Sequence, residues 1–140
     1  LMVFLNGTLK SGIETVLDLL DFDRRLEGVD VVVTGEGATD WQSVFGKVMQ
    51  GIGIHCKAYG IPAVAIVGSM GKGAEDIFEY GIESMITTIN GVMTLPEALD
   101  HAEELYLGAA RRLFRMLRAG RKLSVAVNGV NSNDSHKRAE

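Results

Sequence analysis

Side chains that could do chemistry are concentrated in ten consecutive residues, 34–43 (TGEGATDWQS). The polar side chains of this segment are Thr34, Glu36, Thr39, Asp40, Gln42 and Ser43. The carboxylates Glu36 and Asp40 could hold Mg²⁺ or accept a proton from a substrate hydroxyl. Ser43 could cap a following helix whose N-terminal N–H groups bind an anion, and Lys47, one turn later, could reach the same anion. The pattern indicates a ligand site, although a glycine turn before a capped helix would also produce it.

Two glycine-rich segments could bring backbone close to a ligand. Gly35 and Gly37 lie in the first, where the absence of a side chain permits close approach. The second, residues 68–73 (GSMGKG), resembles a phosphate loop, but it has two residues instead of four before the Gly-Lys pair, and a glycine follows the lysine. We therefore expect only a looser role for it, with Gly68 and Ser69 near a phosphate.

The elements that must position these segments follow from apolar periodicity. Strands are expected over residues 29–35, 62–68 and 84–89, the first two as apolar runs buried on both faces. Helices are expected over residues 12–20, 43–59, 74–80 and from 94 to about 118–120. Strands alternating with helices predict the α/β class, as a parallel Rossmann-like or flavodoxin-like β-α-β-α-β-α unit. Ligands bind beyond the carboxyl ends of such strands, where both glycine-rich segments fall.

Short polar patterns mark the predicted helix ends. Ser11 with Glu14, and Thr94 with Glu97, have the spacing of a capping box, which predicts a helix start at each place. Two glycines are expected just past helix ends, Gly60 and Gly81. Four arginines near the end of the last helix are interpreted as a solvated basic face: Arg111, Arg112, Arg115 and Arg118.

The domain organisation is expected to be that of a piece of a larger protein. Three strands make a small sheet, and the chain opens with the apolar run LMVFL. Residues 1–28 are interpreted as the end of a preceding or inserted domain with a connecting helix. Residues 29–120 would form the C-terminal part of a Rossmann-like domain, and residues 121–140, rich in Asn, Ser and charge, a disordered tail.

Composition excludes several classes of function. The chain has 140 residues, of which 46% are hydrophobic, and no apolar run long enough for a membrane helix, so no membrane partner is expected. Residues 26–110 carry twelve carboxylates against three lysines, which disfavours nucleic-acid binding. The only cysteine, Cys56, fits a reducing, cytoplasmic setting. It follows His55 on a predicted helix, where the two side chains point about 100° apart and make a poor catalytic pair.

The residues around the first strand resemble the signature of the type-1 glycerate kinase family. The matching positions are residues 29–37 (VDVVVTGEG), Asp40, the Gln42-Ser43 pair and residues 46–48 (GKV). Weaker matches are residues 10–13 (KSGI), residues 62–69 (PAVAIVGS) and the alanine-rich last helix. The resemblance covers roughly residues 5–118.

This resemblance implies phosphorylation of D-glycerate with ATP and Mg²⁺, 2-phosphoglycerate being favoured over 3-phosphoglycerate as the product. It also implies a larger two-domain kinase fold, in which one domain is inserted into a Rossmann-like one. Asp40 and Glu36 would be catalytic and hold the metal, Asp40 lying nearest the glycerate hydroxyl or the metal. Lys47 would offset charge on phosphate or on the substrate carboxylate. The binding residues would be Gly35, Gly37, Gln42, Ser43, Gly68 and Ser69.

The sequence departs from the family pattern at several places. Ala38 stands where the family often has arginine, Thr39 where it has an aliphatic residue, and Trp41 where it has a small or polar one. The family's N-terminal Asp-Ser-Phe-Lys-Gly segment and upstream glycine-rich loop are absent, so we expect the rest of the parent chain to be needed and this piece alone to be inactive. A non-catalytic nucleotide- or anion-binding α/β module, or an inactive fragment, are the alternatives.

Overall fold

The fold is a three-stranded parallel sheet with helices on both faces. The computed structural model describes residues 11–40 and 48–134, and of residues 124–134 only the helical backbone. The elements are α2 (Gly12–Leu19), α3 (Phe22–Arg25), β1 (Val32–Thr39), α4 (Val48–Ala58), β2 (Ala63–Met70), the 3₁₀ helix η2 (Ala74–Tyr80), β3 (Ile82–Thr87), α5 (Leu95–Asp100) and α6 (Ala102–Asp134). The sheet has the order β1-β2-β3, and both pairs of strands are parallel. The predicted α/β class is confirmed.

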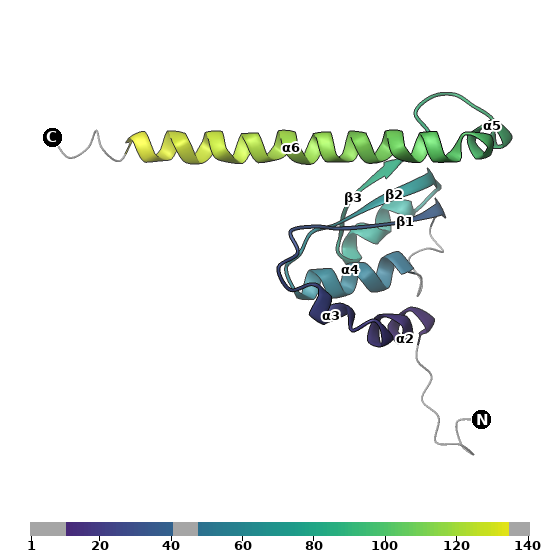
Figure 1. The fold of residues 1–140 in the computed structure, drawn as a ribbon, viewed down its shortest axis with the longest axis horizontal. Helices are drawn as coiled ribbons and strands as arrows, with labels where there is room; N and C mark the ends of the chain where they lie inside the picture. The colour runs from purple at the N-terminus through teal and green to yellow at the C-terminus, as the bar shows by residue number, and fades with distance from the viewer. Residues whose placement is uncertain (1–10, 41–47, 135–140) are drawn as a thin grey trace, which may run out of the picture.

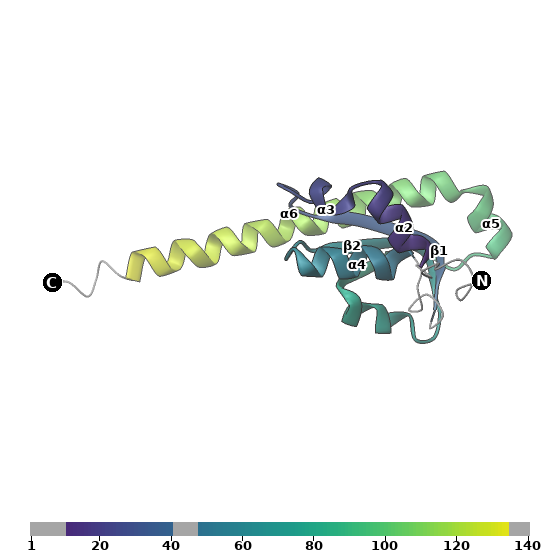
Figure 2. The ribbon, with the colours of Figure 1, turned by 90° about the horizontal axis from the view of Figure 1, so that it is seen from below.

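The elements are stacked in layers. Helix α6 crosses one face of the sheet, α4 lies against the other, and α2 and α3 lie outside α4 (Figure 1). Beyond the sheet, α6 projects far from the other elements (Figures 1 and 2). The carboxyl ends of β1 and β2 therefore meet at one edge of the sheet, near α5 and the start of α6.

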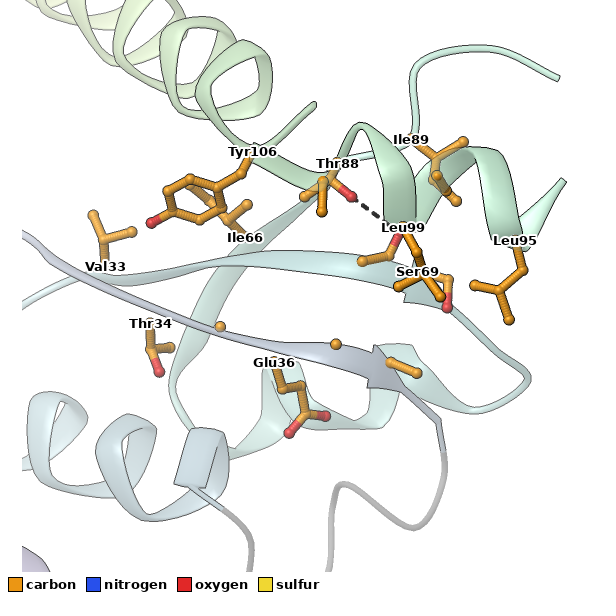
Figure 3. Close-up of a pocket in the computed structure, with 16 residues that line it drawn as sticks. Val33, Thr34, Glu36, Ile66, Ser69, Thr88, Ile89, Leu95, Leu99 and Tyr106 are labelled. Carbon is orange, nitrogen blue, oxygen red and sulfur yellow. Dashed lines mark hydrogen bonds between the residues drawn. The ribbon is translucent and has the colours of Figure 1, made fainter. Parts of the chain in front are cut away.

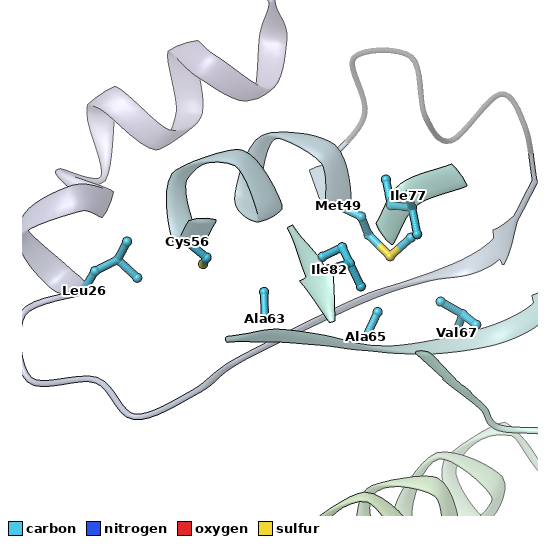
Figure 4. Close-up of a cluster of buried hydrophobic side chains, with 8 residues drawn as sticks. All are labelled: Leu26, Met49, Cys56, Ala63, Ala65, Val67, Ile77 and Ile82. Atoms are coloured by element: carbon cyan, nitrogen blue, oxygen red, sulfur yellow. The ribbon is translucent and has the colours of Figure 1, made fainter. Parts of the chain in front are cut away.

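Strand β2 lies at the centre of both cores. Its residues Ala63, Ala65 and Val67 belong to a cluster on the α4 side that includes Met49 and Cys56 (Figure 4). On the α6 side, the alternate residues of β2 pack against that helix: Val64 and Ile66 join Ala109 and Leu113. These residues, 63–67, are at most 5% exposed, which confirms the prediction of a strand buried on both faces.

The same prediction is wrong for β1. This strand begins at Val32 rather than at residue 29, and along most of its length half-buried and exposed residues alternate. Among the described strands β1 pairs only with β2, so its other edge has no partner in this part of the chain. Residues 36–39, which the sequence predicted to be a turn, continue β1 because β2 runs beside them as far as the pairing of Thr39 with Met70.

Helix α4 approaches its neighbours closely because its buried positions include glycine. A Cβ atom placed on Gly53 would lie 2.5 Å from the carbonyl oxygen of Tyr80, and one on Gly51 would lie 2.6 Å from Cγ1 of Ile13. The first glycine lets α4 pack onto the turn between η2 and β3. The second lets α2 pack onto α4. A side chain at either position would push these layers apart.

One predicted capping box is present and the other is absent. At the start of α5 the hydroxyl of Thr94 accepts a hydrogen bond from the Glu97 amide (3.5 Å), and the Thr94 amide donates to the Glu97 carboxylate (2.7 Å). At the start of α2 the Ser11 side chain makes no capping hydrogen bond. The carboxylate of Glu14 instead lies 3.3 Å from Nε2 of His55. A partner distant in sequence thus replaces the local one.

The other predicted boundaries are partly corrected. Gly60 and Gly81 have the expected positive φ angles, 67° and 98°. Strand β3 starts at Ile82, two residues before the predicted position, because an irregularity in its pairing with β2 accommodates one extra residue there.

The predicted single C-terminal helix is in fact two helices, and its predicted end is wrong. The chain bends at His101 between α5 and α6, and α6 then continues through Gly120 to Asp134. It thereby includes residues 121–134, which the sequence analysis assigned to a disordered tail. One glycine weakens a helix without ending it, and Arg121, Lys122 and Leu123, which follow Gly120, are good helix formers. No helix in the described ranges is both long and apolar enough to cross a membrane.

Replacing Gly53 by alanine should destabilise the protein by about 1–3 kcal/mol, because the new Cβ meets backbone that cannot move without opening the α4 layer. Gly12→Ala is the matched control. Gly12 is exposed at the first turn of α2 with no atom within 4 Å of a Cβ, so this change should be neutral or stabilise by about 0.4–1 kcal/mol. Urea unfolding measures both, and equal midpoints for the two variants would refute the packing argument.

Candidate active site

A cavity of about 920 Å³ opens at the carboxyl ends of β1 and β2 (Figure 3). Ligand cavities for small molecules typically have volumes of about 300–1,000 Å³. Residues of both strands, of the segment after β3 and of α5 and α6 line it: Val33, Thr34, Gly35, Glu36, Gly37, Ala38, Ile66, Gly68, Ser69, Thr88, Ile89, Leu95, Ala98, Leu99, Ala102 and Tyr106. It lies where parallel α/β sheets bind their ligands.

The structure brings together five of the residues that the sequence predicted for the site. Gly35, Glu36 and Gly37 of β1 and Gly68 and Ser69 of β2 all line the cavity. The two glycine-rich segments are therefore two walls of one site.

The other predicted site residues are not among those that line the cavity in the described part of the chain. Asp40 follows β1 directly and is half-buried, but it lies against Gly71 at the end of β2 and does not line the cavity. Gln42, Ser43 and Lys47 lie outside the described residues.

The carboxylate of Glu36 is oriented by a neighbour on the same strand. The hydroxyl of Thr39, a residue only 1% exposed, donates a hydrogen bond of 3.0 Å to Oε1 of Glu36. In Figure 3 the Glu36 side chain points to the side of β1 that faces away from Leu99 and Tyr106. The site consequently has a polar part and an apolar part on opposite sides of β1. Thr39 was noted in the sequence as a polar residue of this segment but was given no role in the site.

Two glycines of the site are needed for the packing of β1 against β2. A Cβ on Gly35 would overlap the carbonyl oxygen of Ile66 on β2, and a Cβ on Gly68 would overlap the carbonyl oxygen of Gly37 on β1. These two glycines therefore allow the strands to approach each other. A Cβ on Gly37 has no atom within 4 Å, so this position faces open space at the cavity.

The segment after β2 is tied to the end of β1. The amide of Gly71 donates a hydrogen bond of 2.7 Å to the carbonyl oxygen of Thr39. This N–H is thus engaged by the protein. Strand β2 extends past its predicted end at Gly68 to include Ser69 and Met70, which the sequence placed in a loop, and Ser69 is exposed at the cavity.

Exposed apolar side chains of α5 and α6 form the wall opposite the strands. Leu95, Leu99 and Tyr106 are 68%, 65% and 51% exposed, and all three line the cavity. Tyr106 lies in the predicted last helix and was not among the predicted site residues. The signal was present, because large apolar residues that no core covers often mark a binding surface.

Arg112 of α6 holds the end of β3 beside the cavity. Its guanidinium donates hydrogen bonds to the carbonyl oxygens of Thr87 (2.9 Å) and Thr88 (3.4 Å). Thr88 in turn donates its amide to Val67 O (2.8 Å) and its hydroxyl to Gly68 O (3.5 Å). The interpretation of this arginine as part of a solvated face is wrong, since it connects α6 to the wall of the site.

The described residues contain no group of three or more His, Cys, Asp or Glu side chains able to hold a metal ion. Cys56 is completely buried, and burial raises the pKa of its thiol, which makes it a poor nucleophile. The described residues at the strand ends present carboxylate, hydroxyl and backbone groups to the cavity.

The chain matches the model of the Glycerate kinase family over residues 1–118. It belongs to this family. The glycerate kinase of Halalkalibacterium halodurans is 39% identical over 81% of this chain, and the glycerate 2-kinase of Escherichia coli K12 is 34% identical over 86% of it. A crystal structure from Salmonella typhimurium LT2, assigned as a glycerate kinase 2, superposes with a TM-score of 0.64 at 33% identity over 86% of the chain.

The chain spans about 30% of the length of these glycerate kinases. The match to the family model ends at residue 118, whereas α6 continues to Asp134. The cavity lies entirely within the part that matches the family.

Gly35→Ala and Gly37→Ala should differ in stability, because Gly35 is needed for the approach of the strands and Gly37 faces the cavity. The first should destabilise by about 1–3 kcal/mol, because the Cβ meets the β2 backbone, and the second should leave stability within about 0.5 kcal/mol of the wild type. Denaturant unfolding checks both values. Equal destabilisation would mean that strand approach at Gly35 is not the constraint inferred above.

Arg112→Met should lower stability by about 1–3 kcal/mol, since it leaves the carbonyl oxygens of Thr87 and Thr88 without their charged donor. Arg111→Met is the control, because Arg111 is exposed on the same helix turn and should contribute little. Thermal unfolding compares the two, and a larger loss for Arg111→Met would contradict the assignment.

Proposed function

We propose that this chain supplies part of the active site of a kinase that transfers phosphate from ATP to D-glycerate. The observation that carries the proposal is the convergence of residues 35–37 and 68–69 on one cavity, in a chain that belongs to the Glycerate kinase family. The pairing of β1 with β2 brings these two segments together at the edge of the sheet where α/β proteins bind their ligands.

The two sides of β1 suit different parts of the substrates. The apolar wall of Leu95, Leu99 and Tyr106 suits the flat, weakly polar base of a nucleotide. The polar side, with Glu36 and then Asp40, suits the reacting groups. Phosphoryl transfer depends mainly on positioning and electrostatics, so a small set of well-placed polar groups is adequate for it.

In the proposed reaction a glycerate hydroxyl oxygen forms a bond to the terminal phosphorus of ATP, and the bond from that phosphorus to ADP breaks. Asp40 or Glu36 would accept the hydroxyl proton. Lys47 would offset charge on the phosphate or on the glycerate carboxylate. Thr39 would keep the Glu36 carboxylate oriented through the hydrogen bond described above.

The donor groups at the end of β1 are compatible with Mg²⁺. The ion usually takes one or two carboxylates together with phosphate oxygens and water, which two carboxylates such as Glu36 and Asp40 could satisfy without a third protein ligand. When bound, Mg²⁺ would neutralise charge on the phosphates.

We also propose 2-phosphoglycerate as the product and the cytoplasm as the location. A relative at 34% identity is named a glycerate 2-kinase, which supports the first. The single, buried cysteine suits a reducing compartment, which supports the second. The remainder of a glycerate kinase would supply the other wall of the cleft.

The proposal predicts activity in a chimaera in which residues 1–118 replace the matching segment of the Halalkalibacterium halodurans glycerate kinase. This protein should release ADP only when ATP and D-glycerate are both present. Glu36→Gln and Asp40→Asn should each lower kcat by about 10²–10⁴, as the loss of a general base does. Glu83→Gln, an exposed carboxylate on β3, is the matched control and should change nothing.

The outcomes separate the alternatives. A chimaera that folds and binds a nucleotide but never turns over would favour a non-catalytic binding module. Full activity in both carboxylate variants would reject their proposed roles. ³¹P and ¹H NMR of the product distinguishes 2- from 3-phosphoglycerate.

A further inference from the structure

His55 on α4 faces a carboxylate from each of two other helices. Its Nδ1 lies 2.5 Å from Oδ1 of Asp23 on α3, and its Nε2 lies 3.3 Å from Oε2 of Glu14 on α2. The His55 side chain is 18% exposed, and the ring of Phe22 packs edge-on against it with the ring centroids 6.0 Å apart. The imidazole therefore connects all three helices at one point.

The chemistry of imidazole decides its charge in this arrangement. A neutral ring carries one N–H and can donate to only one of the two carboxylates, whereas the doubly protonated ring donates from both nitrogens. With the neutral ring, the other nitrogen would present a lone pair to a negatively charged oxygen. Only the imidazolium satisfies both contacts.

We propose that doubly protonated His55 clamps α2 and α3 onto α4, and that this docking weakens when His55 loses its second proton. The clamp is a pH-sensitive conformational device within this chain. It does not depend on the proposed kinase activity.

The charged groups around the ring favour this assignment. On α4 itself, Tyr59 lies near Asp23, whose negative charge raises the pKa of the tyrosine, and Lys57 donates to the carbonyl oxygen of Glu79. On the side of α3, the side chain of Arg25 donates to the carbonyl oxygen of Leu20, and that of Arg24 lies 3.7 Å from the Asp21 carboxylate. Lys57, Arg25 and Arg24 thus have other partners. In the described contacts, the cation that lies beside the Asp23 and Glu14 carboxylates is His55.

The apolar part of the same interface does not titrate. Ile13 packs against the buried Gly51 of α4, and Leu17 of α2 is 4% exposed. Leu26, just after α3, belongs to the cluster beneath α4. Loss of the clamp should consequently loosen α2 and α3 locally, whereas the sheet, which the clamp does not contact, should stay folded.

The direction of the pH effect follows from the ring's partners. The hydrogen bond to Asp23 is the largest cause that raises the pKa of His55 above its ordinary 6.5. Burial opposes this shift, and Glu14 adds to it. A group with a raised folded-state pKa stabilises fully below its unfolded pKa and loses that contribution as the pH rises through the folded value. The docking should therefore be complete below about pH 6 and weaken above pH 6.5.

Hydrogen–deuterium exchange of the 140-residue chain at several pH values tests this inference. After correction for intrinsic exchange, protection of the α2 and α3 amides relative to the β2 amides should fall about fivefold or more between pH 6 and pH 9. In the His55→Gln variant, the protection of the α2 and α3 amides relative to the β2 amides should be low at every pH. Asp23→Asn should remove most of the pH dependence, and Glu14→Gln less of it, because the Asp23 contact is the shorter.

His101→Gln is the matched control. His101, between α5 and α6, is 67% exposed and lies 3.8 Å from Glu104 of α6, far from the clamp in sequence. Its loss should leave the relative protection of the α2 and α3 amides as in the wild type. An NMR titration of the His55 ring in the wild-type chain provides an independent readout that requires no variant. A ring that titrates at or below 6.5, or an α2 and α3 protection that does not change with pH, would overturn the proposal.

Discussion

The approach of helix α4 to strand β2 is the constraint on which the other layers depend. On the side of β2 that faces α4, two of the three core residues are alanines, Ala63 and Ala65, while the side that faces α6 carries Val64 and Ile66. Small side chains leave room for Met49 and Cys56 of the helix, which are completely buried. Because glycines at buried positions of α4 also permit close contact with the turn before β3 and with α2, the helix fixes several elements at once.

This packing brings the chemistry of two distant segments to one place. β2 is held between α4 and α6, and β1 can lie close beside it because glycines replace side chains at the two tightest points of the pair. The strands therefore run together to their carboxyl ends, where their polar residues gather. The segment after β3 joins them because Arg112 and Thr88 attach it to α6 and β2. The cavity is thus a consequence of how the sheet is assembled.

The sequence predicted those features whose cause is local. The buried run of β2, the capping box of Thr94 with Glu97 and the helix ends at Gly60 and Gly81 depend on neighbouring residues, and all are confirmed. Features that depend on a residue distant in the sequence were not predicted. Ser11 and Glu14 have the same spacing as a capping box, but His55, 41 residues after Glu14, binds the carboxylate.

The site shows the same division between local and distant causes. Residue types and the family resemblance pointed to Gly35, Glu36 and Gly37 in one segment and to Gly68 and Ser69 in another, and the structure places these five residues around one cavity. The orientation of Glu36 by Thr39 and the wall supplied by Leu99 and Tyr106 could not be predicted, because strand β1 was expected to end before Thr39 and the helices were not placed against the sheet. The roles of Gln42, Ser43 and Lys47 stay predictions.

The outer edge of β1 has a practical consequence for work with this chain in isolation. Val32, Val33 and Thr34 are β-branched, and their backbone groups on that side have no partner strand among the described elements. An uncovered edge of this composition is a template for intermolecular β-pairing, which natural proteins normally suppress with charge, proline or a covering element. Aggregation of the isolated chain at high concentration would start there.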